Sequence, residues 1–357
     1  MMDIISLLTA AGERGASDVH LIVARPPILR INGYLEPLEA AASLTDDDIK
    51  DAFCQITTPE QQAEFERRKE LDFSYTLPEG RRARCNAAYQ QGTVSMVIRI
   101  LPPVVHDIDE LGLPPVCKEL ILRPRGLIMV SGPTGSGKST TLAAMLKHLN
   151  ASEKRRVVTI EDPVEYLHPS QKCVITQREL GQDTLSFAES LRHVLRQDPD
   201  VILVGEMRDT ETAAAVLNVA ETGHLVLTTG HASSATQAVE RIIDLFPPHE
   251  RNLVQTRLAT LLLGVICQLL VPRMNGSGRV VAIEVMLAIP SVRNLIREGK
   301  LYQLPNMIRT NAQSGMVMMD QSLVGLFRKG VISREQLFAV CNDRDEVEKL
   351  ITMAPYA

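Results

Sequence analysis

Apolar and polar positions in the first hundred residues follow both helical and strand periodicities. Residues 2–14 place apolar side chains at helical spacing, and Thr45 and Pro59 are typical of the starts of two further helices. Alternating patterns predict strands within 18–38 and over 71–77, 81–90 and 93–101. We therefore expect a small α+β domain over residues 1–101.

From residue 116 onward, strand and helix patterns alternate along the chain. Strands are predicted at 126–131, 156–160, 201–204 and 225–229, and helices at 138–149, 186–196, 210–221 and 234–244. Such alternation is typical of a mainly parallel sheet with helices on both faces, so we expect an α/β core over 116–289. Beyond Pro290 the pattern is helical, which predicts a helical C-terminal subdomain over 290–357.

Two Pro-Pro pairs lie between these parts, in the stretch LPPVVHDIDELGLPP. Because proline fixes φ, residues 102–115 are expected to form a semi-rigid linker between the domains. A chain of 357 residues is long enough for two such domains, each with its own core.

The composition narrows the class of protein. A formal net charge of −5 disfavours a nucleic-acid partner, because binding to phosphate backbones requires a concentrated positive face. Six scattered cysteines without close pairs disfavour a structural zinc site and indicate reduced thiols, as in a cytosolic protein. No apolar run reaches the eighteen or so residues of a membrane span. We expect a soluble, cytoplasmic protein that can still dock on a membrane complex.

The stretch from Gly126 to Asn150, GLIMVSGPTGSGKSTTLAAMLKHLN, joins a predicted strand, a glycine-rich turn and a predicted helix. Its centre satisfies the pattern G-x-x-x-x-G-K-[ST], in which backbone N–H groups and the positive end of the helix converge on phosphate oxygens. The motif predicts that ATP binds with Mg²⁺, Lys138 reaching the β and γ phosphates and Ser139 the metal. The predicted nucleotide-binding residues are Gly132, Pro133, Thr134, Gly135, Ser136, Gly137, Lys138, Ser139 and Thr140.

ATP hydrolysis also requires carboxylates that position the water and orient the Mg²⁺ shell. One acidic cluster, EDPVE, follows the strand at 156–160 and contains Asp162 and Glu165. A second begins at Glu206, just after the strand at 201–204. Ligands of open α/β sheets gather at the carboxyl ends of the strands, so we expect both clusters near the phosphate loop. The alternative is that these residues are helix caps and solvated loop charges.

Two histidines and four arginines are further candidates. His224 and His231 flank the predicted strand at 225–229, where a histidine can sense the γ phosphate, although a structural imidazole is the more common role. An arginine fork suits phosphates and can be supplied by a neighbouring subunit, but a solvated surface role fits equally well. The arginines crowd two predicted strands and are Arg81, Arg82, Arg84 and Arg99.

Four segments carry a resemblance to a known family: GPTGSGKST at 132–140, VTIEDPVEY at 158–166, LRQDPDVILVGEMRD at 195–209 and AETGHLVLTTGH at 220–231. Together they resemble the secretion and pilus ATPase family of RecA-like hexameric motors. The resemblance runs from ASDVHLIVARPPILRINGYLEPL at 16–38 to GMVMMDQSLVGLFRKGVIS at 315–333. It implies an α/β, RecA-like P-loop ATPase domain with a helical C-terminal tail, preceded by a smaller α+β PAS-like domain.

The family resemblance also implies roles for individual residues. Six chains would form a ring that holds nucleotide between adjacent subunits. Glu165 would polarise the attacking water, and Glu206 would support the Mg²⁺ shell. Arg84 and Arg99 match arginines that reach the neighbour's nucleotide in the family, and Arg81 and Arg82 match less well.

His231 corresponds to the second histidine of the family's histidine box. Family sequences often read G-T-L-H at this point, whereas this chain has Thr229-Gly230-His231. The resemblance therefore implies a sensor role for His231 with an altered preceding turn.

The segment SVRNLIREGK at 291–300 is similar to AIRNLIRE, a motif associated with pilus retraction, with Ser291-Val292 in place of Ala-Ile. A short N-terminal region and the lack of a paired C-x-x-C insertion also resemble the retraction motors of type IV pili. The resemblance implies ATP-driven pilus retraction in twitching motility. The alternatives are a pilus assembly or type II secretion ATPase, or a nucleotide-gated regulatory paralogue.

Partners and location are likewise implied by the resemblance. The chain would form a homohexamer and act on an inner-membrane platform protein, and through it on pilin, with no nucleic acid involved. It would be cytoplasmic and peripherally associated with the inner membrane at the pilus base. The residues from Arg293 to Glu298 would form a functional patch, or alternatively an amphipathic helix packed within the tail.

Overall fold

The computed structural model describes residues 2–352 except residues 32, 40, 102–103 and 277. The chain divides into two compact units. The first comprises Met1–Val104 together with Pro163–Leu167, and the second comprises Val105–Asp162 together with His168–Ala357.

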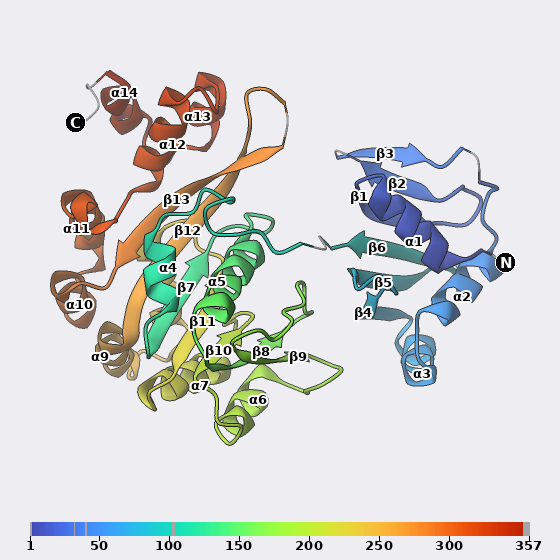
Figure 1. Ribbon diagram of the computed structural model, residues 1–357, viewed down its shortest axis with the longest axis horizontal. Coiled ribbons are helices and arrows are strands. Elements are labelled where there is room, and N and C mark those ends of the chain that lie inside the picture. Colours follow the sequence, from blue (N-terminus) through green and yellow to red (C-terminus); the bar gives the residue numbers. More distant parts are fainter. Residues whose placement is uncertain (1, 32, 40, 102–103, 277, 353–357) are drawn as a thin grey trace. The chain divides into compact units, whose positions relative to one another are not determined.

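An antiparallel sheet of six strands forms the first unit, with three helices packed on one of its faces (Figure 1). The strand order is β3-β2-β1-β6-β5-β4. The strands are β1 (Ala16–Leu21), β2 (Ile28–Ile31), β3 (Tyr34–Pro37), β4 (Glu70–Thr76), β5 (Arg82–Gln90) and β6 (Thr93–Ile100). The helices are α1 (Ile4–Glu13), α2 (Asp46–Gln55) and α3 (Pro59–Arg68). The α+β composition predicted for this part of the chain is confirmed.

Side chains at the helix starts explain why two of these helices begin where they do. Thr45 and Asp48 form a reciprocal capping box at α2, and Thr58 and Gln61 form another at α3. Each box satisfies backbone N–H groups that the first helical turn leaves without partners. Pro59 then occupies the first position of α3, where its missing N–H costs nothing.

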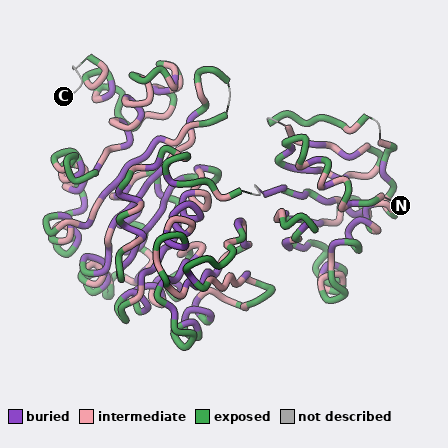
Figure 2. Tube along the Cα trace, in the orientation of Figure 1, coloured by how far each residue is buried: buried purple, intermediate pink, exposed green. Residues whose placement is uncertain are grey.

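A sheet of seven strands forms the centre of the second unit, in the order β13-β12-β7-β11-β10-β8-β9. All neighbours are parallel except β12 and β13 at one edge, which confirms the mainly parallel sheet. The strands are β7 (Gly126–Ser131), β8 (Arg156–Glu161), β9 (Val174–Glu179), β10 (Val201–Val204), β11 (Leu225–Gly230), β12 (Leu262–Pro272) and β13 (Arg279–Leu287). The strands lie buried between helical layers (Figure 2).

Helices cover both faces of this sheet and fill two separate apolar cores. One face carries α4 (Val116–Ile121) and α5 (Lys138–Ser152). The other core includes α6 (Phe187–Val194), α7 (Thr210–Glu221), α8 (Ala235–Asp244) and α9 (Arg251–Leu261). The predicted strand 201–204 and helix 210–221 match β10 and α7 at both ends.

The C-terminal helices join the second of these cores. They are α10 (Pro290–Arg297), η1 (Leu301–Gln303), α11 (Leu304–Thr310), η2 (Ala312–Ser314), α12 (Met319–Arg328), α13 (Arg334–Val340) and α14 (Arg344–Thr352). Buried residues of α10, α12 and α14 belong to the same apolar cluster as β12 and β13. The helical pattern predicted from Pro290 is confirmed, and the tail is continuous with the core of the sheet.

The segment 102–115 was expected to be a linker, but its described part packs within the second unit. Pro102 and Pro103 lie outside the described residues. From Val105 the segment belongs to the second unit, and Ile108 and Leu113 are buried in the core that also holds α5. Apolar side chains between the two Pro-Pro pairs give this stretch a surface to bury.

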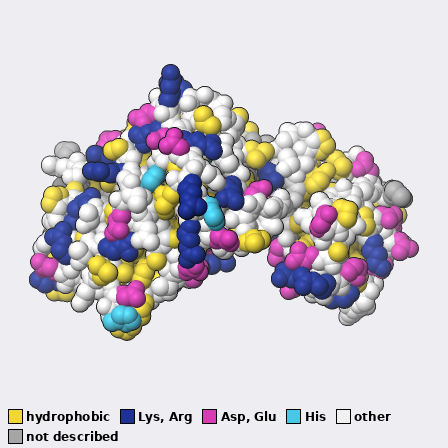
Figure 3. All heavy atoms as spheres, turned by 90° about the horizontal axis from the view of Figure 1, so that it is seen from below, with side chains coloured by type: hydrophobic (Ala, Val, Ile, Leu, Met, Phe, Trp, Pro, Cys, Tyr) yellow, Lys and Arg dark blue, Asp and Glu magenta, His cyan; other side chains and the backbone are white. Residues whose placement is uncertain are grey.

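Among the described residues, no helix combines the length and the apolarity needed to span a bilayer. On the face shown in Figure 3, Lys and Arg side chains lie among Asp and Glu side chains. All six cysteines are free thiols; Cys54 is exposed, Cys341 is half-buried and the other four are buried. Burial raises the pKa of the Cys85 and Cys117 thiols to about 12.

Candidate functional site

The glycine-rich loop lies where β7 ends and α5 begins, at the carboxyl edge of the sheet. Gly132 and Gly137 have φ values of +146° and +90°, a region that side chains with a Cβ rarely adopt. A Cβ at Gly132 would lie 2.3 Å from the carbonyl oxygen of Gln268. Close packing as well as backbone geometry therefore requires glycine at this position. The crest of the loop, Pro133 to Gly135, is exposed.

Lys138 closes over the loop from the first turn of α5. Its ammonium Nζ donates to the carbonyl oxygens of Gly132 at 2.8 Å and Pro133 at 3.0 Å. Ser139 and Thr140 follow in the same turn and are half-buried. The loop thus presents a cation, the start of a helix and hydroxyl groups within one short segment, which suits the binding of phosphates.

Gln268 on β12 supports the loop from below and was not predicted. Its side chain is buried, and Nε2 donates to the carbonyl oxygen of Ser136 at 2.7 Å. In the described part of the chain, Gln268 Oε1 and Ser136 Oγ are buried without a hydrogen-bond partner. The signal in the sequence was an amide side chain, Gln268, within the otherwise mostly apolar run of 258–271.

Glu206 and His231 come together at the ends of the neighbouring strands β10 and β11. The Glu206 carboxylate is half-buried and pairs with Arg208 at 2.7 Å and with Nε2 of His231 at 3.1 Å. The Thr229 hydroxyl donates to the carbonyl oxygen of Gly205, which ties the two strand ends together. Glu206, one of the predicted acidic residues, therefore lies beside His231, which was also predicted.

The turn that carries His231 is also tied to the phosphate loop. Ser131, the residue before Gly132, is opposite Gly230 in register, and its hydroxyl donates to the Ala232 carbonyl at 2.7 Å. A Cβ at Gly230 would lie 2.2 Å from Cε of Met129. A larger residue at 230 would therefore have to displace the flexible end of the Met129 side chain.

The residues of the first acidic cluster belong to different units. Glu161 ends β8 and accepts from the Thr159 hydroxyl at 2.6 Å and from Gln177 Nε2 at 3.3 Å. Asp162 follows and is exposed. Glu165 lies in Pro163–Leu167, the segment that belongs to the first unit, where Arg82 Nε donates to the Val164 carbonyl at 3.2 Å. Glu161 is the first residue of the predicted acidic cluster, but it was not among the predicted site residues.

His224 lies away from this group of residues. Its carbonyl oxygen accepts from the N–H of Gly126, the first residue of β7, so it sits at the opposite edge of the sheet from His231. The length of β11, about 20 Å at roughly 3.3 Å per residue, separates the two histidines. Its Nδ1 lies 3.0 Å from the Thr222 hydroxyl and 3.1 Å from the Val219 carbonyl oxygen. Within one chain, the structure gives this imidazole local backbone and hydroxyl contacts.

The arginines of the first unit lie on its sheet and beside α1. Arg84 and Arg99 are directly opposite each other on β5 and β6, and both are exposed. Arg99 Nε donates to the buried Asp18 carboxylate at 3.0 Å. These two guanidinium groups lie on the face opposite the helices, because the neighbouring residues on each strand point into the core.

Arg82 and Arg81 have internal contacts. Arg82 donates to the hydroxyls of Ser74 at 2.8 Å and Thr76 at 2.9 Å. Arg81 packs against Gly12 of α1, where an added Cβ would lie 1.7 Å from its Nη1. Arg82 thus ties β5 to β4, and Arg81 packs beside α1 within the first unit.

Arg293 has an internal structural role at the end of α9. Its guanidinium donates to the carbonyl oxygens of Ala288 at 2.6 Å and Leu262 at 2.9 Å, and to those of Ala259 and Thr260. Burial and the nearby Arg297 lower the pKa of Arg293. Glu298 is exposed, and its pKa is lowered by its hydrogen bonds to Lys300 and Asn294.

Comparison with known proteins agrees with this arrangement. Residues 3–289 match the family model described as type II/IV secretion system protein. The "Type IV pilus retractation ATPase PilT" of Pseudomonas aeruginosa is 45% identical over 334 residues, 94% of this chain and 96% of that protein. The "Type II secretion system protein E" of Pectobacterium carotovorum is 38% identical, with 74% of this chain and 53% of that protein covered.

A solved structure is similar over nearly its whole length. The "Crystal Structure of the Pilus Retraction Motor PilT and Bound ADP" has a TM-score of 0.91 at 40% identity and covers 98% of this chain and 100% of that one. The family model spans the phosphate loop, Glu206 and His231, and the α/β fold is shared with the solved motor. By sequence and by fold, the chain belongs to the type II/IV secretion system protein family.

Proposed function

We propose that this protein is an ATP-hydrolysing motor that drives type IV pilus retraction in twitching motility. The observation that carries the proposal is the phosphate loop with its Lys138 ammonium, set next to the Glu206–His231 pair at one edge of the sheet. Relatives and a solved structure of pilus retraction motors, matched over nearly the whole chain, support the same activity.

In this proposal the second unit is the RecA-like P-loop ATPase domain, over 116–289 with the helical tail 290–357, and the PAS-like domain covers 1–101. The residues from Gly132 to Thr140 hold the phosphates of ATP. The Ser139 hydroxyl and the Glu206 carboxylate fit a Mg²⁺ ion, because Mg²⁺ at nucleotide sites takes few protein ligands and several phosphate and water oxygens. When bound, the ion would neutralise charge on the phosphates.

Groups outside the phosphate loop complete the proposed chemistry. Glu165 polarises the attacking water, and Arg84 and Arg99 of a neighbouring copy stabilise the charge that develops on the γ phosphate. His231, held on Glu206 at 3.1 Å, reports the state of the γ phosphate to the sheet. In this proposal six chains form a ring, in which the first unit of one copy serves the second unit of the next.

Force arises in this scheme when nucleotide binding and hydrolysis change how the first unit packs on a neighbouring copy. The hinge is the boundary between the units near Val104 and Val105. The moving ring acts on an inner-membrane platform protein, and so withdraws pilin from the base of the pilus. Retraction is favoured over type II secretion because the secretion relative is matched over only 53% of its own length.

The first test is steady-state ATPase activity of the purified protein, with its mass measured by light scattering with and without Mg-ATP. Hydrolysis that rises as a sixfold species assembles, and that is lost in Lys138→Ala, supports the motor. A monomer that binds ATP without hydrolysing it contradicts the proposal and indicates a nucleotide-gated regulator.

A second test addresses the water-polarising group. Glu165→Gln is expected to abolish turnover while ATP binding remains, because an amide cannot accept the proton from water. Unchanged turnover in this variant would rule out Glu165.

A further inference from the structure

Glu284 on β13 is a buried carboxylate that holds the starts of two helices. Its side chain is 1% exposed. One oxygen accepts from the N–H of Ala235 at 2.7 Å, and the other accepts from the N–H of Met319 at 3.2 Å. Ala235 and Met319 are the first residues of α8 and α12.

The chemistry of this contact explains how the carboxylate tolerates burial. The first N–H groups of a helix have no partner within the helix, and its start carries a partial positive charge. Burial and the nearby Asp320 raise the pKa of Glu284, whereas the two N–H donors lower it. Removing either oxygen would leave a buried N–H unsatisfied.

Glu284 is connected to the phosphate loop through a row of residues across the sheet. It is opposite Cys267 on β12, Cys267 is opposite Ser131 on β7, and Ser131 is opposite Gly230 on β11. The Ser131 hydroxyl holds the Ala232 carbonyl, while Glu284 holds the N–H of Ala235. The turn that follows His231 is therefore anchored at both ends.

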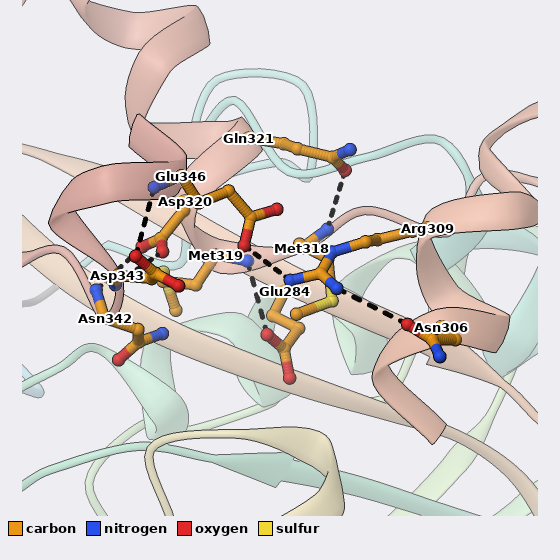
Figure 4. A network of polar contacts seen from close by, with 10 residues as sticks. All are labelled: Glu284, Asn306, Arg309, Met318, Met319, Asp320, Gln321, Asn342, Asp343 and Glu346. Carbon is orange, nitrogen blue, oxygen red and sulfur yellow. Dashed lines mark hydrogen bonds and ion pairs between the residues drawn. The ribbon is translucent and has the colours of Figure 1, made fainter. Parts of the chain in front are cut away.

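The second oxygen of Glu284 continues the connection into the C-terminal helices (Figure 4). Asp320, the next residue after Met319, is itself buried and accepts from the N–H groups of Asn342 and Asp343 at 2.8 and 3.0 Å, just before α14. Two buried carboxylates thus link the turn beside His231 to α12 and then to α14.

We propose that Glu284 is a positioning residue that sets the turn carrying His231 and joins this turn to α12. It touches no nucleotide and acts through the placement of the imidazole on Glu206. The inference rests on the proposed ATPase function. Through Glu284, a movement of the turn that carries His231 after hydrolysis is transmitted to the C-terminal helices. A force on those helices is likewise transmitted to the nucleotide site.

The test is kinetic and uses the full chain with Mg-ATP. Glu284→Gln keeps one acceptor oxygen but sets an NH₂ group against a backbone N–H. We expect kcat to fall about tenfold with KM for ATP changed by less than about threefold, because the phosphate loop is not in contact with Glu284. A KM effect with unchanged kcat would overturn the proposal.

A double-mutant cycle with His231→Ala distinguishes two effects of Glu284→Gln, the displacement of His231 and a general loss of packing. If Glu284 acts through His231, Glu284→Gln causes no further loss of kcat in the His231→Ala background. Losses that multiply would overturn the proposal. Asp320→Asn is the matched control, since it removes an acceptor from α14 in the same network but leaves α8 untouched. Its kcat is expected to fall by less than about threefold, and a loss as large as that of Glu284→Gln would overturn the proposal.

Hydrogen exchange on the wild-type chain tests the inference even where a variant fails to fold. On addition of Mg-ADP, the amides of Ala235 and Met319 are expected to change their protection together. A change at Ala235 with none at Met319 overturns the proposal. A wild-type protein that shows no hydrolysis refutes the proposed function instead, and the exchange comparison then decides the inference separately.

Discussion

The backbone at Gly132 has a conformation and a surrounding that exclude a side chain. Its φ is +146°, and an added Cβ would lie 2.3 Å from the Gln268 carbonyl oxygen, which is backbone and cannot rotate away. Gly135 in the same loop also has positive φ, but its added Cβ would meet nothing within 4 Å. The two glycines therefore separate the effect of packing from that of backbone angle.

We expect Gly132→Ala to lower the free energy of unfolding by about 3 kcal/mol or more, because both steric overlap and backbone strain act there. Gly135→Ala is expected to lower it by about 1 kcal/mol, through the backbone angle alone. Urea denaturation of the nucleotide-free protein measures both values. Equal losses in the two variants would contradict the packing argument.

His168, in the segment after β8, should make stability depend on pH. Burial of its half-buried ring lowers its pKa from 6.5 to about 4. Between these values the unfolded chain binds a proton that the folded chain does not, so stability is present above about pH 6.5 and is lost as the pH falls towards 4. At about 1.4 kcal/mol for each pH unit, the loss is at most about 3.5 kcal/mol.

The measurement compares the free energy of unfolding of the wild type and His168→Gln between pH 7 and pH 4. Glutamine does not titrate, so the variant is expected to lose less stability than the wild type over this range. Carboxylates that titrate in both proteins cancel in the difference. Parallel curves would show that the ring is not the source.

At the scale of elements, the end of α9 depends on a residue of another helix. Arg293 of α10 donates to carbonyl oxygens at the end of α9, which have no partners within that helix. We expect Arg293→Ala to lower the free energy of unfolding by about 2–4 kcal/mol, because hydrogen bonds from a charged group are lost and buried acceptors remain. Denaturant unfolding with an unchanged slope measures the loss.

Arg297, one turn further along the same helix and exposed, is the control for this substitution. Arg297→Ala is expected to change stability by no more than about 0.5 kcal/mol. If Arg293→Ala were equally mild, the RNLIRE segment would act through an external partner and not through α9.

Elements with strong periodicity were predictable, and elements held by tertiary contacts were not. Apolar runs predicted β7, β10 and β11, and the capping residue Thr45 predicted α2. By contrast, β9 has the sequence VITQRE, whose polar residues gave no strand pattern, and it forms by pairing with β8. Helix α14 is mostly charged and is fixed by Asp320 at its start, a contact that spacing does not reveal.

The candidate site was predictable to a similar extent. Glu206 and His231 follow the ends of β10 and β11, and their 3.1 Å contact agrees with the rule that neighbouring parallel strands end at one edge of the sheet. Lys138 begins α5, after the loop that follows β7. His224 was a candidate on the same grounds as His231, but it precedes β11 and lies at the opposite edge of the sheet from His231. Gln268 and Glu284 were missed because their contacts are 132 and 35–49 residues away in sequence.

At the scale of the whole molecule, the proposed ring divides each site between two chains. Lys138→Ala removes the phosphate contact, and the double variant Arg84→Ala, Arg99→Ala removes the arginines of the first unit. Each variant alone is expected to hydrolyse ATP about a thousandfold more slowly than wild type. Mixed in equal amounts, they are expected to recover activity, because some interfaces combine an intact loop with intact arginines.

The ATPase rate of the mixture, measured after reassembly, decides this point. As a control, Lys138→Ala carrying the two arginine substitutions as well should rescue neither variant. Recovery would show that the arginines act in trans. A mixture no faster than its components would place them in structural roles, such as the contact of Arg99 with Asp18.

The distribution of thiols gives a way to follow such a motor while it works. Cys54, on α2 of the first unit, is exposed, while burial keeps most of the other thiols out of reach of reagents. With Cys341→Ser and a new cysteine in place of the exposed Lys329, a donor dye and an acceptor dye would sit one on each unit. Energy transfer between them would report each stroke of a single subunit in real time.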